Sequence, residues 1–168
     1  MRSRMIHRLM GYGLLVSLLV ASATALAWSA SAHEHRTVGS YELVVGFLNE
    51  PAVSGELNGL SLRVTEAPAA DVAATPGAEA EGAPVEGLET TLQAEVIYGD
   101  QRMPLTLAPA WKDPGHYTAP LIPTQPGDYS FHIWGTINGV DIDETFTAGP
   151  DTFSTVIDRT TLEFPTSS

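Results

Sequence analysis

The chain has 168 residues, which is long enough for one domain with a buried core. It contains no cysteine, and this excludes disulfides, cysteine-ligated zinc, iron–sulfur clusters and the thiolate-dependent blue-copper site. Its 20 acidic residues outnumber its 8 basic ones and give a net charge of −12, so we expect neither nucleic acid nor an anionic lipid surface as a partner.

The first 32 residues have the pattern of an export signal. A start with three arginines precedes an almost uncharged apolar run over 9–28, and Ala30-Ser31-Ala32 supplies the small-x-small pattern of a cleavage site. We therefore predict a helical signal peptide over 1–32 and a mature, exported chain over 33–168, periplasmic or extracellular. If cleavage fails, the apolar run is long enough to anchor the protein in a membrane. Cleavage leaves five basic against 20 acidic residues, a net charge of −15.

The mature part predicts short strands separated by turn signals, and no helix. Residues 67–87 interrupt them with Ala, Pro, Gly and Glu and no periodic apolar face, which predicts a solvated, mobile loop. Turn-spaced short strands favour one all-β domain over 33–168, an antiparallel immunoglobulin-like β-sandwich of about seven strands. The strands are expected over 41–48, 60–64, 88–98, 103–107, from Tyr117 onward, 129–137 and 140–147, with a candidate edge strand in the tail 152–164.

The last two predicted strands are joined by the strongest hairpin signal in the chain. Asn138-Gly139 suits a type I′ turn, so Ile137 should pair with Val140. The period of 2 then places one set of side chains on the outer face: His132, Trp134, Asp141 and Asp143. It places an apolar set on the core face: Phe131, Ile133, Ile137, Val140, Ile142 and Phe146. Glu144 falls among the apolar set, which predicts that it lies at a sheet edge or at a bulge.

Two Pro-Gly-x-Tyr turns precede strands, at Pro114-Gly115-His116-Tyr117 and Pro126-Gly127-Asp128-Tyr129. The second resembles the strand start of immunoglobulin-like domains, where the tyrosine hydrogen-bonds back across the corner. Phe131 stands where a disulfide-bonded domain would carry cysteine, so apolar packing must replace the bridge. With the histidine that cleavage exposes, the chain resembles the exported YtkA-like and FixH-like domains and, more distantly, CopC-like copper-resistance proteins. The resemblance implies an envelope location, a link to copper handling or oxidase maturation, and a copper-dependent oxidase or transport protein as partner.

The new N-terminus, His33-Glu34-His35, is the sharpest candidate site. In one geometry His35 binds Cu(II) with its imidazole, the terminal amine and the two intervening deprotonated amides, a square-planar nitrogen set that Cu(II) and Ni(II) prefer. In the other, His33 chelates through its amine and imidazole, and a body imidazole such as His132 or His116 joins it. CopC-like proteins bind Cu(II) through an N-terminal His and a downstream Asp-x-His; His33 matches the first element, whereas Asp113 and His116 are three positions apart.

The other metal candidates have ordinary alternatives. His132 and Asp143 share an outer face, where they either ligate a metal or form a solvated polar surface. His116 stands on a turn, as a ligand or as an exposed histidine. Met103 is the one methionine of the mature chain, so any copper bound should be Cu(II) rather than Cu(I) in a Met-rich site.

No catalytic motif accompanies these residues. The chain has no Gly-x-Ser-x-Gly, His-Glu-x-x-His or phosphate-binding loop, so we do not expect an enzyme. The sequence predicts an exported, non-enzymatic domain that binds or delivers Cu(II) in the cell envelope. The alternative is a metal-free adhesion or assembly module that docks another envelope protein through the Trp134 face or the Trp111 turn. Copper binding requires cleavage after Ala32, whereas docking does not depend on it.

Overall fold

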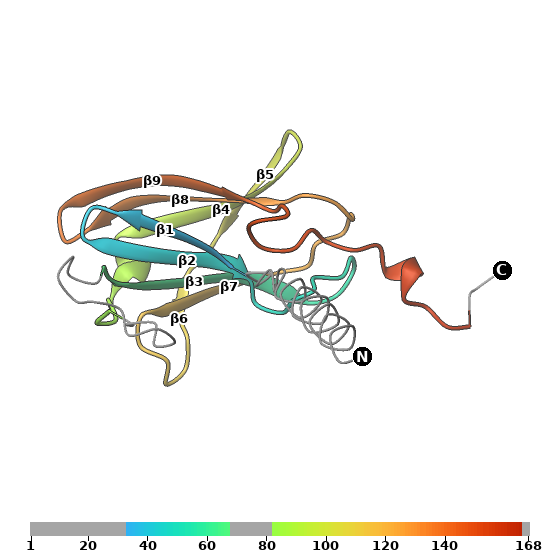
Figure 1. The fold of residues 1–168 in the computed structure, drawn as a ribbon, viewed down its shortest axis with the longest axis horizontal. Coiled ribbons are helices and arrows are strands. Elements are labelled where there is room, and N and C mark those ends of the chain that lie inside the picture. The colour runs from blue at the N-terminus through green and yellow to red at the C-terminus, as the bar shows by residue number, and fades with distance from the viewer. Residues whose placement is uncertain (1–32, 68–81, 166–168) are drawn as a thin grey trace, which may run out of the picture.

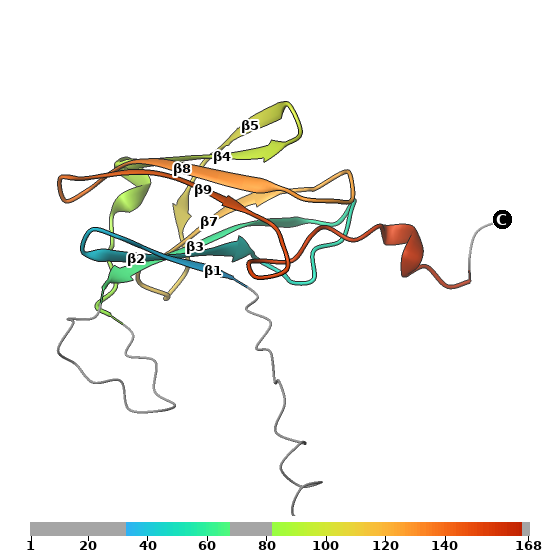
Figure 2. The same ribbon diagram turned by 45° about the horizontal axis from the view of Figure 1, so that its top comes forward.

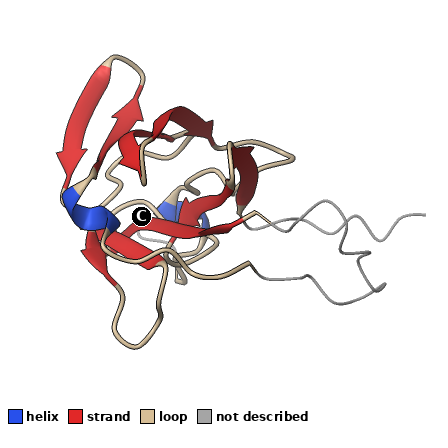
Figure 3. Cartoon of the chain, turned by 90° about the vertical axis from the view of Figure 1, so that its left-hand side faces the viewer, coloured by secondary structure: helices blue, strands red, loops and turns tan. Residues whose placement is uncertain are grey.

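The computed structural model describes residues 33–67 and 82–165. The predicted signal peptide and most of the predicted loop lie outside the described residues. Within them the chain forms two antiparallel sheets packed face to face, an immunoglobulin-like β-sandwich, as predicted (Figures 1 and 2). Over residues 33–67 and 82–165, helix is limited to two short 3-10 turns, η1 (Leu88–Thr90) and η2 (Arg159–Thr161), drawn in blue in Figure 3. No helix among the described residues is long and apolar enough to cross a membrane.

Each sheet is assembled from strands that are distant in the sequence. The five-stranded sheet has the order β1-β2-β3-β7-β6 and the four-stranded sheet the order β5-β4-β8-β9. Figure 2 shows the four-stranded sheet lying over the five-stranded one. The bounds are β1 (Glu34–Val38), β2 (Tyr41–Phe47), β3 (Asn58–Glu66), β4 (Leu92–Tyr98), β5 (Gln101–Leu105), β6 (Ala108–Pro109), β7 (His116–Leu121), β8 (Ser130–Ile137) and β9 (Val140–Thr147).

The core lies between the sheets and is filled by alternate side chains of their strands. Phe131 is fully buried and joins the layers through aromatic contacts, with ring centroids 5.3 Å from Phe47 on β2 and 5.6 Å from Phe153. This is the apolar packing expected where a disulfide-bonded domain has its bridge. Tyr129 also behaves as predicted, because its hydroxyl donates to the carbonyl of Gln125 at 3.0 Å across the corner.

The β8–β9 hairpin confirms the predicted register. Ile137 pairs with Val140, and Asn138 and Gly139 both have positive φ, at 47° and 87°. The pairs Trp134–Asp143 and His132–Thr145 follow as expected. The predicted core face is also confirmed: Phe131, Ile133, Ile137, Ile142 and Phe146 are buried and Val140 packs against them.

The structure has two strands that the sequence did not predict, and the predicted tail strand is wrong. The seven expected strands are β2 to β5 and β7 to β9; β1 and the two-residue β6 are additional. The tail forms two isolated bridges, Val53 with Ile157 and Gly127 with Val156, and then η2. The side chain of Asp158 accepts from the Thr160 amide and begins that turn, so the tail leaves extended geometry before a strand can form.

The final residues of the segment predicted as a loop pack on the domain. Pro84 bridges to Thr65 at the end of β3, and Val85 is buried. The Tyr117 hydroxyl donates to the Val85 carbonyl at 2.7 Å and accepts from the Leu88 amide at 3.1 Å. Tyr117 is thus a fold residue that fixes residues 84–88 against β7.

Candidate functional site

The outer face of the five-stranded sheet carries three of the five candidate ligands. The register aligns His35 with Val44, Val44 with Arg63, and Arg63 with His116, so that these side chains form one row across β1, β2, β3 and β7. His33 lies in a bend directly before β1. Strand pairing thus brings His35 and His116, which are far apart in the sequence, onto one surface.

His116 is held in a fixed orientation by its neighbours. Its Nδ1 lies 2.9 Å from Asp113 Oδ2, and its Nε2 lies 2.9 Å from the Ser61 hydroxyl. Arg63 in turn donates to both carboxylate oxygens of Asp113, at 3.0 and 2.7 Å. Hydrogen bonds from Arg63 and then His116 lower the pKa of Asp113. An ionised carboxylate at Nδ1 favours the tautomer in which Nδ1 is protonated and Nε2 keeps its lone pair.

The order of contacts Ser61–His116–Asp113 is that of a serine hydrolase triad. Ser61 is 8% exposed and stands on a strand paired on both sides. A pocket of about 410 Å³ opens between the β4–β5 hairpin and residues 121–125, and one of about 240 Å³ opens beside the turn at 109–115; Ser61 lines neither of these two.

His33 lies within electrostatic range of the same group of residues. Burial lowers the pKa of its imidazole; the charges of His35, His116 and Arg63 lower it further, and Glu50 opposes them. A lowered pKa keeps this imidazole neutral at pH 7, the form that binds metal. His116 and His35 each have a carboxylate at Nδ1, so the tautomer that this contact favours leaves the lone pair on Nε2 in both.

His35 belongs to β1, and its pairing in this strand conflicts with the first Cu(II) geometry, in which three consecutive residues, 33–35, wrap around the ion. Glu34 pairs with Val45 and His35 with Val44, and His35 Nδ1 lies 3.0 Å from Glu42 Oε1. A chelate that used the amide nitrogens of Glu34 and His35 would take this stretch out of the extended ladder. With β1 paired to β2 (the docked strand), the structure suits the second geometry, which uses His33 and an imidazole from the body of the domain.

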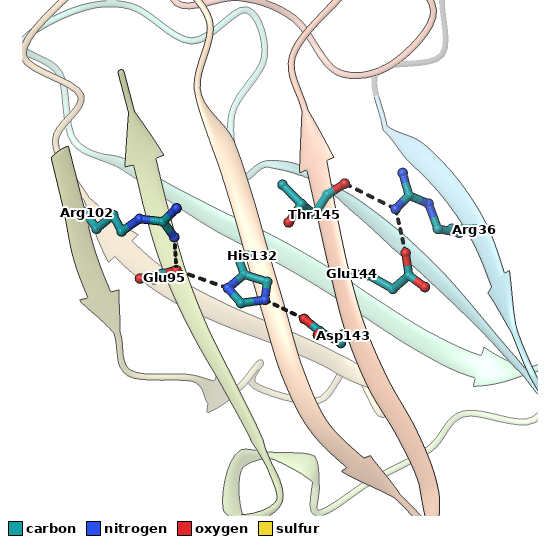
Figure 4. Close-up of polar contacts among 7 residues, drawn as sticks. All are labelled: Arg36, Glu95, Arg102, His132, Asp143, Glu144 and Thr145. Atoms are coloured by element: carbon teal, nitrogen blue, oxygen red, sulfur yellow. Dashed lines mark hydrogen bonds and ion pairs between the residues drawn. The ribbon is translucent and has the colours of Figure 1, made fainter. Parts of the chain in front are cut away.

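Arg36 is a residue that the sequence reading missed, and it fastens β1 to the opposite sheet. Its guanidinium donates to Glu144 Oε2 at 2.6 Å and to the Thr145 carbonyl at 3.1 Å (Figure 4). It also contacts Glu34. It also lies 4.4 Å from the ring centroid of Phe146. Glu144 is thus on the edge strand β9, as predicted. The sequence carries one signal for this strand. Glu34, Arg36 and Val38 occupy alternate positions, as on one face of a strand, and Gly39-Ser40 follows them as a turn signal.

His132 and Asp143 lie on the outer face of the other sheet. His132 Nδ1 is 3.0 Å from Glu95 Oε1, and its Nε2 is 2.7 Å from Asp143 Oδ1 (Figure 4). Arg102 donates to Glu95 at 2.6 Å, so charges of alternating sign cross all four strands. Hydrogen bonds to Asp143 and Glu95 raise the pKa of His132 despite some burial. The Trp134 ring stacks on the imidazole, with centroids 4.7 Å apart.

The surroundings of His132 favour its protonated form. With a carboxylate at each ring nitrogen, the imidazolium donates twice and has no lone pair for a metal. The five candidate ligands are therefore split between two outer faces: His33, His35 and His116 on one, and His132 and Asp143 on the other. Among the described residues no three His, Asp or Glu side chains already converge on one metal position.

No protein-family model matches the chain, and no curated protein matches it. The resemblance to YtkA-like, FixH-like and CopC-like domains thus depends on the residue pattern alone.

Proposed function

We propose that the mature protein binds Cu(II) at its N-terminus, through the amine and imidazole of His33 and the Nε2 of His116. The observation that carries this proposal is the strand register, which places His116 on the outer face of the five-stranded sheet in one row with His35, while His33 directly precedes the same strand β1. Cleavage after Ala32 would supply the amine. Two imidazoles and an amine are ligands that suit Cu(II), and none of them depends on a thiolate.

The neighbours of His116 support its role. Asp113 accepts from Nδ1 and is itself fixed by Arg63, so Nε2 is the ring nitrogen that keeps a lone pair, and it faces Ser61 on β3. Metal-binding histidines usually have such a carboxylate on the other nitrogen, and its loss typically costs about 10–100-fold in metal affinity. In the structure the Ser61 hydroxyl occupies the Nε2 position, and a metal ion would displace that hydrogen bond.

We further propose that the protein is exported and carries or delivers Cu(II) in the cell envelope, without catalysis of its own. A mature charge of −15 attracts cations over the whole surface. The recipient would be an envelope protein of copper chemistry, a copper-dependent oxidase or a transporter. The single methionine of the mature chain, Met103, is 47% exposed on β5 and belongs to the other sheet, so it offers no support for Cu(I) at this site.

The test is Cu(II) titration of the mature protein and three histidine variants. His33→Ala and His116→Ala should each weaken binding at least about tenfold, since each removes one imidazole ligand. His132→Ala is the matched control, because this histidine is on the other sheet with both nitrogens facing carboxylates. Unchanged affinity in His116→Ala would contradict the proposed ligand set.

A second candidate function has one observation in its favour. Trp111 is 87% exposed on the turn before β7, and the adjacent Lys112 has a φ of 58°. An exposed aromatic side chain on a strained turn suits docking to a partner protein. Trp134 is less suitable, because the His132 ring covers one of its faces. A metal-free docking module would lose its partner in Trp111→Ala and keep it in the copper-site variant His33→Ala.

A further inference from the structure

The N-terminus offers a metal two alternative donor sets, and strand β1 separates them. Both sets use the terminal amine of His33. One adds the imidazoles of His33 and His116 and leaves β1 in place. The other adds the amide nitrogens of Glu34 and His35 and the His35 imidazole, and it needs β1 released. The inference below rests on the proposed Cu(II) site, because it concerns which of the two sets forms there.

The docked strand and the amide chelate exclude each other. Glu34 and His35 are paired with Val45 and Val44 of β2. A square-planar chelate places four nitrogens from three consecutive residues around one ion, which an extended strand cannot do. Forming it would therefore break the first two pairs of the β1–β2 ladder and the contact between His35 and Glu42. The rest of β1 would stay in place, since Val38 packs against the core.

Arg36 supplies side-chain contacts that resist this release. It reaches across the open side of the sandwich to Glu144 and to the Thr145 carbonyl (Figure 4). It also holds the Glu34 side chain. Charge-assisted hydrogen bonds of this kind are about twice as strong as neutral ones. The guanidinium also covers the face of Phe146. One side chain thus ties the residue that would donate the first amide nitrogen, Glu34, to strand β9.

We propose that Arg36 determines which donor set the N-terminus offers to a metal, by keeping β1 on the sheet. Cu(II) and Ni(II) both favour square-planar nitrogen sets, which here means the amide chelate. While β1 stays paired with β2, only the amine and the imidazoles are accessible to either ion. Arg36 acts as a positioning residue, because it supplies no donor atom to either set but decides which of them is accessible.

The test compares Ni(II) binding to the mature protein and to Arg36→Ala, followed by the visible absorption of the square-planar Ni(II)–amide complex. The apparent affinity for a state that is rarely populated is reduced by its population. Release of β1 should therefore raise the apparent Ni(II) affinity about tenfold, equivalent to about 1.4 kcal/mol. Cu(II) bound to Arg36→Ala should absorb at shorter wavelength than in the parent protein, because deprotonated amides are stronger-field ligands than imidazoles.

Three further variants make the comparison specific. Glu144→Gln removes the ion pair from the β9 side and should change Ni(II) affinity in the same direction. Arg36→Lys keeps the charge and should return the Ni(II) affinity part of the way toward that of the parent protein. Arg102→Ala is the matched control, because this arginine also pairs with a carboxylate, Glu95, but on the far edge of the other sheet. It should leave Ni(II) affinity unchanged.

A second measurement requires no metal. Backbone amide exchange over 34–38 should be about tenfold faster in Arg36→Ala than in the parent, while exchange over the β8–β9 hairpin stays the same. Equal Ni(II) affinity and equal β1 exchange in the two proteins would overturn the inference and leave the Cu(II) proposal standing. Faster β1 exchange with higher Ni(II) affinity would support the inference even if His116→Ala showed that His116 is not the copper ligand.

Discussion

Two histidines of this domain differ in the groups that face their ring nitrogens. His116 has the Asp113 carboxylate at one nitrogen and the Ser61 hydroxyl at the other. His132 has carboxylates at both, which raises its pKa and favours the imidazolium. We therefore propose His116 rather than His132 as a metal ligand, and His132 links strands β4, β8 and β9 through its two carboxylate contacts.

The contribution of His132 to stability should depend on pH. Its pKa is raised in the folded state, so the imidazolium is stabilised by folding. This contribution is fully present below the unfolded pKa of about 6.5 and is lost as pH rises through the folded pKa. We expect His132→Gln to lower the free energy of unfolding by about 1 kcal/mol at acidic pH and by much less in mild alkali. Urea unfolding of both proteins at the two pH values measures this. A difference that does not vary with pH would show that the two ion pairs contribute nothing through charge.

Elements with local signals were predictable, whereas elements made by distant contacts were not. The β8–β9 hairpin follows from Asn138-Gly139 and from the largely alternating apolar and polar positions on either side of this turn, both visible in the sequence. Strand β1 depends on Arg36 reaching Glu144, a residue 108 positions away. It also adjoins the predicted cleavage site, where a short charged stretch suggests a frayed terminus.

The residues of the candidate site also divide into those with a local sequence signal and those placed by contacts between distant parts of the chain. The outer-face placement of His132 and Asp143 came from the period of a single hairpin. The chain of contacts from Ser61 through His116 to Asp113 joins β3 to β7 over 55 positions, and no local pattern encodes that pairing. Arg63 could have been assigned to the outer face of its strand, but its bond to Asp113 depends on the sheet order β3-β7.

The segment between β3 and η1 should be removable in its middle but not at its end. Gly82 lies directly against the backbone of Glu66, so the two ends of the segment are close together. Deleting 70–81 should therefore leave the thermal unfolding midpoint nearly unchanged. Deleting 70–85 should lower it by several degrees, since it also removes buried Val85 and its contact with Tyr117. Equal midpoints for the two deletions would show that residues 82–85 add no stability.

At the scale of the whole molecule, the two sheets depend on a cluster of aromatic side chains in place of a disulfide. Phe131 has no exposed surface and contacts both Phe47 and Phe153. Replacing Phe131 by Ala should lower the free energy of unfolding by about 3–5 kcal/mol, from lost burial and from the cavity left behind. Chemical denaturation gives this value directly. A loss below about 1 kcal/mol would mean that the sheets are held together by other contacts.

The two outer faces of the sandwich then have separate roles, with the proposed copper ligands on one and the charge chain of His132 on the other. The measurement that tests the copper site most directly is Cu(II) titration of the mature protein that begins at His33 against a protein extended before His33. The extension converts the terminal amine into an amide and removes a ligand that both possible donor sets share. We predict tight binding of one Cu(II) by the mature protein, weakening as pH falls because protons compete for the amine and imidazoles, and a collapse of affinity in the extended protein. Equal affinity in the two proteins would contradict an N-terminal copper site.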